Sequence, residues 1–509
     1  MNDKIAVLDF GSQYTQLIAR RIRELGIFCQ VFRADEAHVF EAVQGVGGVV
    51  LSDGAHASQS APLLEHLRSL PCPLLAIGGS AYALCGAPAL AHNLRQPPRQ
   101  LRIPVPCHPL LAPLAPSGNT PAQPSSPVLS FLAPSPLALG ASWESIAHFA
   151  EGEVAAVAHR QKPWLGVFFH IETSKTPVGA DIFRNFLQGV CQMKGTWQVD
   201  EIAQQAILEI RAQVQEGKVL CALSGGVDST VTAVLVHKAI GNRLQCIYVN
   251  TGLMREGETE SVARMFERFQ IPLEVVDARE RFLGQLAGVT EPETKRKRIG
   301  AEFIAVFEEA AAKFEGIAFL AQGTIYPDII ESMPLPGGTP VKSHHNVGGL
   351  PERMQLQLVE PLKHLFKDEV RKLGKHLGLE AAFVERQPFP GPGLAVRVLG
   401  EVTEAKLAVL RKADALLQEE VAQLQHKPWQ VFAVLLPVQS VGATREKRTY
   451  APTLALRAVE SQDGMTASPT HLPWAFLDKV SSRLLAEVEG INRVVLDISP
   501  KPPATIEWE

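Results

Sequence analysis

Short apolar, β-branched runs alternate with amphipathic stretches over much of the first 190 residues. The apolar runs fit buried strands, which we expect at residues 5–9, 48–51, 74–78, 154–159 and 164–170. The amphipathic stretches fit helices, which we expect at residues 14–25, 81–85 and 182–191. Because strands separated by helices pair in parallel, this alternation predicts an α/β fold with a doubly wound parallel sheet.

A second alternation of the same kind begins at residue 201. We expect strands at residues 219–223, 244–249, 273–276 and 317–321, with helices at residues 201–214 and 229–240. This pattern predicts a second doubly wound sheet, whose ligands bind at the carboxyl ends of its strands. From residue 389 onward, long helices and alternating strands predict an α+β unit. The expected domains are residues 1–194, 195–388 and 389–509.

Proline interrupts the pattern in one place. Of the 37 prolines, 12 lie between Pro97 and Pro136, where an even spread would put about three. Residues 97–140 contain no acidic residue and only Arg99 and Arg102 as bases. Because proline at this density disfavours helices and central strands, we expect a loop without regular structure.

Composition narrows the class of protein. A chain of 509 residues with 46% hydrophobic residues predicts about three domains at ~150 residues each. The net charge of −4 excludes a global basic field for nucleic acid or a membrane surface. Seven cysteines without a C-x-x-C pair argue against a disulfide framework or a zinc knuckle and favour a reducing cytoplasm. We find no export signal and no apolar run of membrane-spanning length.

The strongest local motif is a glycine-containing loop between a predicted strand and a predicted helix. It consists of Ser224, Gly225, Gly226, Val227, Asp228, Ser229 and Thr230. Backbone N–H groups freed by paired glycines, together with hydroxyls at a helix start, form a cradle for phosphate. The spacing fits neither a Walker A loop nor a dinucleotide-binding signature. The alternative is a tight turn in which Asp228 or Ser229 only caps the helix.

The loop resembles that of the ATP pyrophosphatases, which cleave ATP between its α and β phosphates. Further runs resemble one family of that group, the GMP synthases, at residues 250–255, 295–297, 323–328, 342–350, 388–393 and 501–509. The likeness keeps the family's order and covers essentially the whole chain. It implies conversion of XMP to GMP: ATP with Mg²⁺ adenylates the purine C2 oxygen, pyrophosphate leaves, and ammonia displaces AMP.

The resemblance also implies roles for individual residues. Residues 224–230 bind ATP, and the synthase catalytic residues are Asp228, Lys342, His344 and His345, the last three in a glycine-rich lid. The XMP-binding residues are Arg296, Gln430, Arg493, Lys501, Ile506 and Glu507. Asp328 and Glu331, three residues apart, face one way if that stretch is helical, and their oxygens suit Mg²⁺. A solvated helix face is the alternative for this pair.

Residues 1–194 resemble a class I glutamine amidotransferase domain, through residues 8–15 and through His170 and Glu172. Glutamine hydrolysis needs a cysteine on a strand-to-helix elbow, a histidine, an acid and an oxyanion hole. Alignment of residues 73–82 on the family's elbow puts Gly78 at the cysteine position.

Other parts of the glutamine site also depart from the family. The Gly-Gly-Pro turn of the oxyanion hole reads Asp53-Gly54-Ala55, and the proline-rich stretch replaces a glutamine-side loop. Cys85, seven residues beyond Gly78, is expected in the core, and Ser80 lacks a complete Ser-His-acid set. The domain is therefore expected to be glutaminase-inactive, with His170 and Glu172 as remnants.

These observations predict an ammonia-dependent ligase of this family. The expected partners are XMP, ATP and ammonia, with no nucleic acid and no membrane, in a cytoplasmic homodimer formed through residues 389–509. Three alternatives stay open: glutamine use through an external or unrecognised glutaminase, an ATP pyrophosphatase that modifies tRNA, and a degenerate regulatory nucleotide-binding protein. The undamaged 224–230 loop argues against the last.

Overall fold

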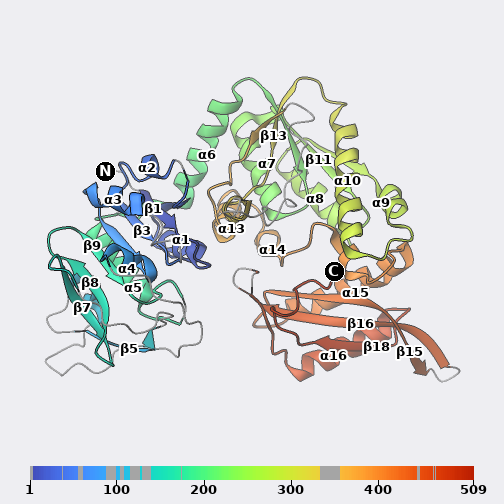
Figure 1. The fold of residues 1–509 in the computed structure, drawn as a ribbon. Coiled ribbons are helices and arrows are strands. Elements are labelled where there is room, and N and C mark those ends of the chain that lie inside the picture. The colour runs from blue at the N-terminus through green and yellow to red at the C-terminus, as the bar shows by residue number, and fades with distance from the viewer. Residues whose placement is uncertain are drawn as a thin grey trace. The chain divides into compact units, whose positions relative to one another are not determined.

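The computed structural model of the chain describes residues 4–36, 38–54, 61–86, 99–103, 108–114, 127–128, 139–173, 175–332, 356–443, 448–461, 464 and 466–509. Contacts divide the chain into two compact units, Met1–Ile202 (the first unit) and Ala203–Glu509 (the second unit). Figure 1 shows both units with their labelled elements. Within the described ranges, no helix combines the length and apolar character that a membrane crossing requires.

The first unit is built on a nine-stranded sheet with the order β2-β1-β3-β4-β9-β8-β7-β5-β6. The first five strands in this order are parallel and the others pair antiparallel. The strands are β1 (Lys4–Asp9), β2 (Phe28–Arg33), β3 (Gly48–Leu51), β4 (Leu74–Ile77), β5 (Arg99–Arg102), β6 (Pro127–Val128), β7 (Trp143–Phe149), β8 (Val154–His159) and β9 (Trp164–Val167). The predicted parallel sheet is confirmed, and four of its five strands, β1, β3, β4 and β9, were expected from the sequence. Strand β2 was not predicted, and the strand expected at residues 154–159 is β8, which pairs antiparallel.

Helices pack beside this sheet, and the cover they give accounts for the apolar sequences of its strands. They are α1 (Thr15–Glu24), α2 (Val39–Ala42), α3 (Ala61–Ser69), α4 (Gly79–Leu84) and α5 (Gly179–Arg184), with short turns at η2 (Pro109–Leu114) and η3 (Asn185–Val190). Strands β3, β4 and β9 are buried at every position. Because both faces of such strands are covered, their sequences are continuous apolar runs rather than alternating ones.

The proline-rich stretch contains regular structure, which differs from the loop expected over residues 97–140. Strand β5 pairs antiparallel with β7, and Leu101 in β5 is fully buried opposite Phe149. Arg99 in β5 forms ion pairs with Glu151 and Glu153. Since β5 and β6 lie at the edge of the sheet, nearby prolines remove no central hydrogen bond. Most of the stretch lies outside the described residues.

The second unit contains a five-stranded parallel sheet with the order β12-β11-β10-β13-β14, which confirms the second predicted α/β sheet. Its strands are β10 (Lys218–Leu223), β11 (Leu244–Asn250), β12 (Leu273–Asp277), β13 (Ile317–Ala321) and β14 (Gln357–Val359). Its helices are α6 (Val199–Val214), α7 (Val227–Ile240), α8 (Glu258–Arg268), α9 (Arg279–Leu286), α10 (Pro292–Ala311), α11 (Tyr326–Ser332), α13 (Lys367–His376) and α14 (Ala381–Val384), with a turn at η4 (Gly241–Arg243). Helix α7, which follows β10 directly, is the most deeply buried of its neighbours.

The last part of the second unit is the expected α+β structure. Strands β15 (Gln430–Ala443) and β16 (Arg448–Glu460) form a long antiparallel hairpin, β17 (Ser468–Pro469) extends it, and β18 (Arg493–Asp497) pairs parallel with β16. The turn η5 (Gly393–Arg397) and helices α15 (Glu404–Ala422) and α16 (Trp474–Glu487) accompany the sheet.

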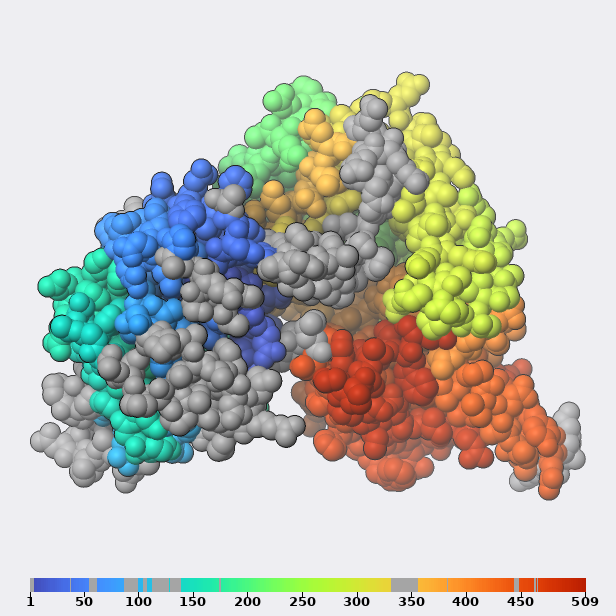
Figure 2. Space-filling view, in the orientation of Figure 1, coloured from blue at the N-terminus to red at the C-terminus, as the bar shows by residue number. Residues whose placement is uncertain are grey.

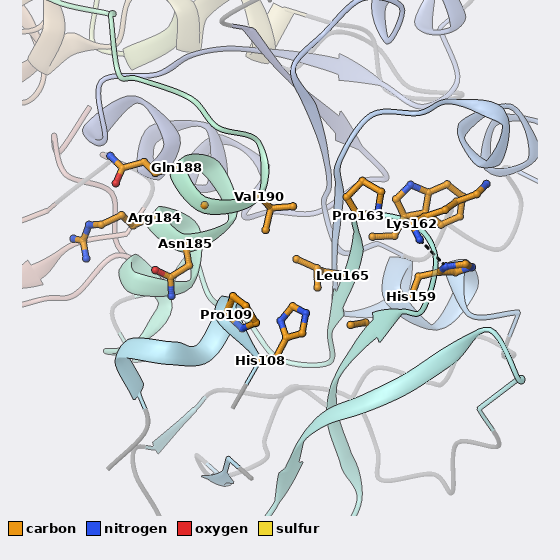
Figure 3. A pocket seen from close by; sticks show the side chains of 13 residues that line it. His108, Pro109, His159, Lys162, Pro163, Leu165, Arg184, Asn185, Gln188 and Val190 are labelled. Carbon is orange, nitrogen blue, oxygen red and sulfur yellow. Dashed lines mark hydrogen bonds between the residues drawn. The ribbon is translucent and has the colours of Figure 1, made fainter. Parts of the chain in front are cut away.

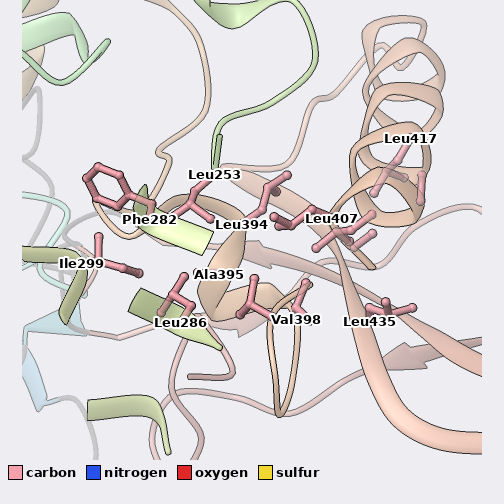
Figure 4. Packing of buried hydrophobic residues seen from close by; sticks show 14 of the residues in the cluster. Leu253, Phe282, Leu286, Ile299, Leu394, Ala395, Val398, Leu407, Leu417 and Leu435 are labelled. Carbon is pink, nitrogen blue, oxygen red and sulfur yellow. The ribbon is translucent and has the colours of Figure 1, made fainter. Parts of the chain in front are cut away.

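One apolar core joins the two sheets of the second unit. Figure 4 shows side chains from α9, α10, η5, α15 and β15 packed against one another, among them Leu286, Ile299, Leu394, Leu407 and Leu435. Because this core is continuous, the parallel sheet and the hairpin sheet are held in a fixed relation within the unit. The boundary expected at residue 389 stays a prediction.

Candidate functional site

The 224–230 loop lies at the carboxyl end of β10, where ligands of parallel sheets bind. Gly225 has a positive φ of 74°, and Gly226 is the N-cap of α7. The Gly226 N–H donates to Ser224 Oγ (3.2 Å), and Thr230 Oγ1 donates to the Gly226 carbonyl (2.9 Å). No side chain caps α7, so the alternative in which Asp228 or Ser229 only caps this helix is wrong. The first backbone N–H groups of α7 stay available for an anion.

Asp228 of this loop is held by a cation that the sequence analysis missed. Lys367 Nζ donates to Asp228 Oδ1 (2.8 Å) and Oδ2 (2.6 Å). Gly323, which follows β13, permits a close approach, because a Cβ there would lie 2.9 Å from the Ser229 nitrogen. Lys367 is the first residue of α13, where a cation opposes the helix dipole. The sequence held no signal for this contact, because no helix was expected at residues 367–376 and Asp228 is 139 positions away.

The proposed magnesium carboxylates lie on one helix, which was the condition for their spacing to place them on one side. Asp328 and Glu331 both belong to α11, and Asp328 Oδ2 accepts from the Ile325 N–H (3.0 Å). The Glu331 side chain is not among the described groups, and no cluster of three or more possible metal ligands occurs within the described ranges. Mg²⁺ bound with nucleotide phosphates needs only one or two carboxylates, so this donor chemistry fits it. Magnesium binding by these two residues stays a prediction.

The predicted lid residues Lys342, His344 and His345 lie outside the described residues. Their assignment therefore rests on the sequence resemblance alone.

Two of the predicted XMP residues meet around a buried arginine. Gln430 Nε2 donates to Glu507 Oε1 (2.9 Å). Arg397 donates to both oxygens of the same carboxylate, from Nη2 to Oε1 (2.8 Å) and from Nε to Oε2 (2.9 Å). Arg397 has no exposed surface. This residue was not among the predicted site residues. Its signal in the sequence is that it is the one charged residue in the apolar run 394–399.

The other predicted XMP residues occupy separate positions in the same unit. Arg296 on α10 donates to the Glu509 backbone carbonyl, and Lys501 Nζ donates to the Gly464 carbonyl (2.9 Å). The Ile506 carbonyl accepts from Nε of the fully buried Arg457 (2.7 Å), and Arg493 begins β18 with an exposed side chain. The structure thus brings Gln430 and Glu507 together, and a hydrogen bond joins Arg296 to the main chain of Glu509. Nucleotide binding by the six residues stays a prediction.

In the first unit, Gly78 lies at the predicted turn from a strand to a helix. It follows β4 directly, is the N-cap of α4 and has φ 65° and ψ −128°. Residues with a side chain rarely adopt this conformation. A Cβ at this position would lie 2.6 Å from Asp53 Cγ and 2.7 Å from Asp53 Oδ1. The backbone has the form of an elbow, and the space for a nucleophilic side chain is filled by Asp53.

His170 is bracketed by two carboxylates. Its Nδ1 lies 2.5 Å from Glu172 Oε1, and its Nε2 lies 3.5 Å from Asp53 Oδ2. All three side chains are at most 6% exposed. Burial acts to lower the pKa of His170, but the hydrogen bond and charge of Glu172 and the charge of Asp53 outweigh it, and the pKa is raised. The predicted remnants thus meet in a buried group that sequence spacing did not reveal, because Asp53 is distant in the chain.

Neither Ser80 nor Cys85 supplies the missing nucleophile. Ser80 Oγ is fully buried and donates to the Ile77 carbonyl (2.9 Å), while it accepts from the Ile77 N–H (3.2 Å). Burial raises the pKa of the Cys85 thiol to about 12, so the reactive thiolate is scarce at neutral pH.

A separate pocket of about 400 Å³ lies at the other end of the parallel strands from Gly78, next to the start of β9 (Figure 3). His108, His159, Lys162 and Asn185 are its main polar side chains. Asn185 Nδ2 donates to the Leu110 carbonyl (2.7 Å), and His159 Nδ1 accepts from the Lys162 N–H (3.2 Å). Because these groups bond within the chain, the pocket shows no arrangement for chemistry.

Comparisons with known proteins show which family the chain resembles. A family model described as GMP synthase C terminal domain matches residues 418–508, and one described as NAD synthase matches residues 202–297. A curated protein of Carboxydothermus hydrogenoformans is 48% identical over an alignment of 534 residues, which covers 100% of both chains. One of Phenylobacterium zucineum is 46% identical over 519 residues, which cover 100% of this chain and 99% of its own. Both are named GMP synthase (glutamine-hydrolyzing).

A solved structure is also similar to part of the chain. It is described as a putative GMP synthase subunit from Thermoplasma acidophilum, and its alignment covers 37% of this chain and 94% of its own. The sequence identity is 24% and the TM-score is 0.30, which is too low to compare folds.

The raised pKa of His170 predicts how the first unit responds to pH. A histidine whose folded pKa exceeds its unfolded value stabilises the fold fully below about pH 6.5, and that contribution is lost as pH rises through the folded pKa. His170→Gln should therefore reduce hydrogen-exchange protection of residues 164–172 more at pH 6 than at pH 9, each measured against wild type. His38→Gln, at an exposed histidine, is the matched control. An equal loss of protection at both pH values would contradict the prediction.

Proposed function

The chain belongs to the GMP synthase family, and from that premise we propose that it uses free ammonia rather than glutamine. As a member of the family it is an ATP-dependent ligase that converts XMP to GMP and forms a carbon–nitrogen bond. The observation that carries the ammonia proposal is Gly78, which offers no nucleophile at the elbow, next to a carboxylate that fills the vacant space. Without a thiolate there, no covalent glutamyl intermediate forms and no ammonia is released within the chain.

We propose that residues 224–230 hold the phosphates of ATP. The uncapped start of α7 and the Ser224 and Ser229 hydroxyls are the donors, and the paired glycines let the backbone approach. Asp228 is the carboxylate of this loop, and Lys367 positions it through two hydrogen bonds. Lys342, His344 and His345 are proposed to close over the phosphates as donors. Bound Mg²⁺ neutralises phosphate charge, and Asp328 and Glu331 are its proposed protein ligands.

We propose that XMP binds on the C-terminal part of the second unit. Glu507 and Gln430 are polar groups suited to the edge of a purine or to a ribose, and Ile506 supplies an apolar contact. Arg296, Arg493 and Lys501 are the proposed cations for the phosphate. Adenylation turns the C2 oxygen into a good leaving group, and the lone pair of ammonia then attacks C2 as AMP departs.

We further propose a homodimer formed through residues 389–509. The end of the β15–β16 hairpin exposes Val438, Val441 and Tyr450, and β18 is followed by the exposed Ile498. Figures 1 and 2 show this hairpin end as a projection in orange. Exposed apolar side chains gathered on one element are typical of a protein interface.

We propose a reducing cytoplasm as the location, since the six described cysteines form no disulfide.

Turnover with ammonium and with glutamine distinguishes the proposal from a glutamine-hydrolysing enzyme. With XMP and Mg·ATP, GMP formation should be robust with ammonium, and its rate should rise with pH because only unprotonated ammonia attacks. With ammonia-free glutamine it should be at least about 10³-fold slower, as expected when a nucleophile is missing. Glutamate release is measured in parallel. Comparable rates with the two nitrogen donors would refute the proposal.

Lys367→Met tests the 224–230 loop. Loss of the cation that fixes Asp228 should lower XMP-dependent pyrophosphate release by about 10²-fold or more, since a preorganised charge is removed. Lys372→Met on the same helix, at an exposed lysine whose nearest ion-pair distance is 4.0 Å, is the matched control and should keep wild-type activity. Pyrophosphate release that is equally fast in both variants would show that Lys367 has no part in ATP chemistry.

Sedimentation velocity tests the homodimer. The double variant Val441→Asp/Tyr450→Asp places charges in the exposed apolar hairpin and should sediment as a monomer where the wild type sediments as a dimer. Leu208→Asp, at an exposed leucine on α6, is the control and should leave the dimer intact. A wild type that is monomeric, or a double variant that stays dimeric, would exclude this interface.

A further inference from the structure

The carboxylate of Asp53 occupies a position normally left open in an amide-hydrolysing site. Its Oδ1 accepts hydrogen bonds from the backbone N–H of Gly79 (2.6 Å) and from that of Gly54 (2.9 Å). Gly79 directly follows the elbow residue Gly78. In hydrolases built on such an elbow, the N–H after the nucleophile binds the oxygen on which negative charge develops. Asp53 Oδ1 therefore stands where the oxygen of a substrate would bind.

The rest of the Asp53 carboxyl group also takes a position that a substrate would need. Its Cγ would lie only 2.6 Å from a Cβ at residue 78, so it occupies the space next to any nucleophile placed there. Its Oδ2 lies 3.5 Å from Nε2 of His170, whose other nitrogen is bonded to Glu172. The nitrogen that would take a proton from a nucleophile thus faces a carboxylate of the same chain. Asp53 is only 4% exposed, so its carboxylate faces His170 inside the unit and not in bulk solvent.

We propose that Asp53 is a built-in lock on the former glutamine site: its carboxylate replaces the acyl group of the substrate and couples the identity of residue 53 to that of residue 78. The inference rests on the proposed loss of glutaminase activity and deepens it. Gly78 removes the nucleophile, whereas Asp53 closes the site to an acyl substrate independently. A nucleophile restored at residue 78 would therefore meet a carboxylate instead of glutamine, so a change at residue 78 alone would not restore glutamine hydrolysis.

The proposed coupling makes a thermodynamic prediction that separates it from simple backbone strain. Gly78→Ala suffers from the positive φ at residue 78 whatever stands at residue 53. It suffers from the clash with the carboxyl group only when Asp53 is present. In a double-mutant cycle of residues 53 and 78, the cost of backbone strain is the same in both backgrounds and cancels. The cost of the clash is present in one background only and remains as the coupling. Asp53→Gly should therefore relieve part of the damage caused by Gly78→Ala.

Hydrogen exchange of residues 74–84 in the full chain measures this coupling locally. Gly78→Ala should reduce protection at least about tenfold more in the wild-type background than in the Asp53→Gly background. Asp53→Asn keeps the shape of the side chain without its charge, so it should give no relief, and it is the matched control. Additive effects, or an Asp53→Gly/Gly78→Ala variant no better protected than Gly78→Ala, would overturn the lock; a double variant that fails to fold counts the same way.

Thiol alkylation gives a second readout. In Gly78→Cys, iodoacetamide should modify the introduced thiol at least about tenfold more slowly than in Asp53→Gly/Gly78→Cys, because the carboxylate blocks access and disfavours the thiolate. Cys85, with a pKa raised to about 12, is the internal reference and should react slowly in both. Equal alkylation rates would overturn the lock. Both readouts are independent of synthase turnover, so a failed lock and failed ammonia use can be told apart.

Discussion

Three buried cations set the main constraint on the second unit. Arg397, Arg457 and Lys295 have no exposed side-chain surface. A buried charge without a partner costs several kcal/mol, so each must be neutralised locally. Residues 497–509 supply a carboxylate to each of them: Glu507 binds Arg397, Asp497 binds Arg457, and Glu509 binds Lys295. Helix α10, the turn η5 and strand β16 are therefore held together by one returning segment of chain.

The same segment carries several residues proposed for XMP, which links folding to binding. Glu507 neutralises Arg397 and also bonds Gln430, so its carboxylate is oriented before a nucleotide arrives. A site whose charged groups are fixed in advance loses less conformational entropy on binding. Arg397 also lies over the rings of Phe389 and Phe432, which ties this carboxylate to the 388–393 run and to β15. The position of residues 497–509 is thus set by the buried cations of the second unit.

Sequence alone was sufficient where a local pattern decides the structure. Apolar runs predicted most of the parallel strands, although β2 and β14 were missed, and the glycine pair with its hydroxyls predicted the loop after β10. Both signals lie within about ten residues. Contacts between distant residues gave no such signal: Lys367 meets Asp228 across 139 positions, and Arg397 meets Glu507 across 110. The edge strand β5 was hidden by the prolines on either side of it. Asp53 was noticed only as a departure from the family turn, since its partners Gly79 and His170 are brought near by the sheet.

The elbow at Gly78 has a consequence for any redesign of this site. A cysteine in that backbone conformation would store strain, whereas glycine adopts it freely. Because Asp53 fills the adjoining space, a side chain placed at residue 78 alone collides with it. A change at residue 53 alone removes a buried partner of the Gly79 N–H and of His170. A redesign therefore has to treat residues 53 and 78 as one unit and change them together.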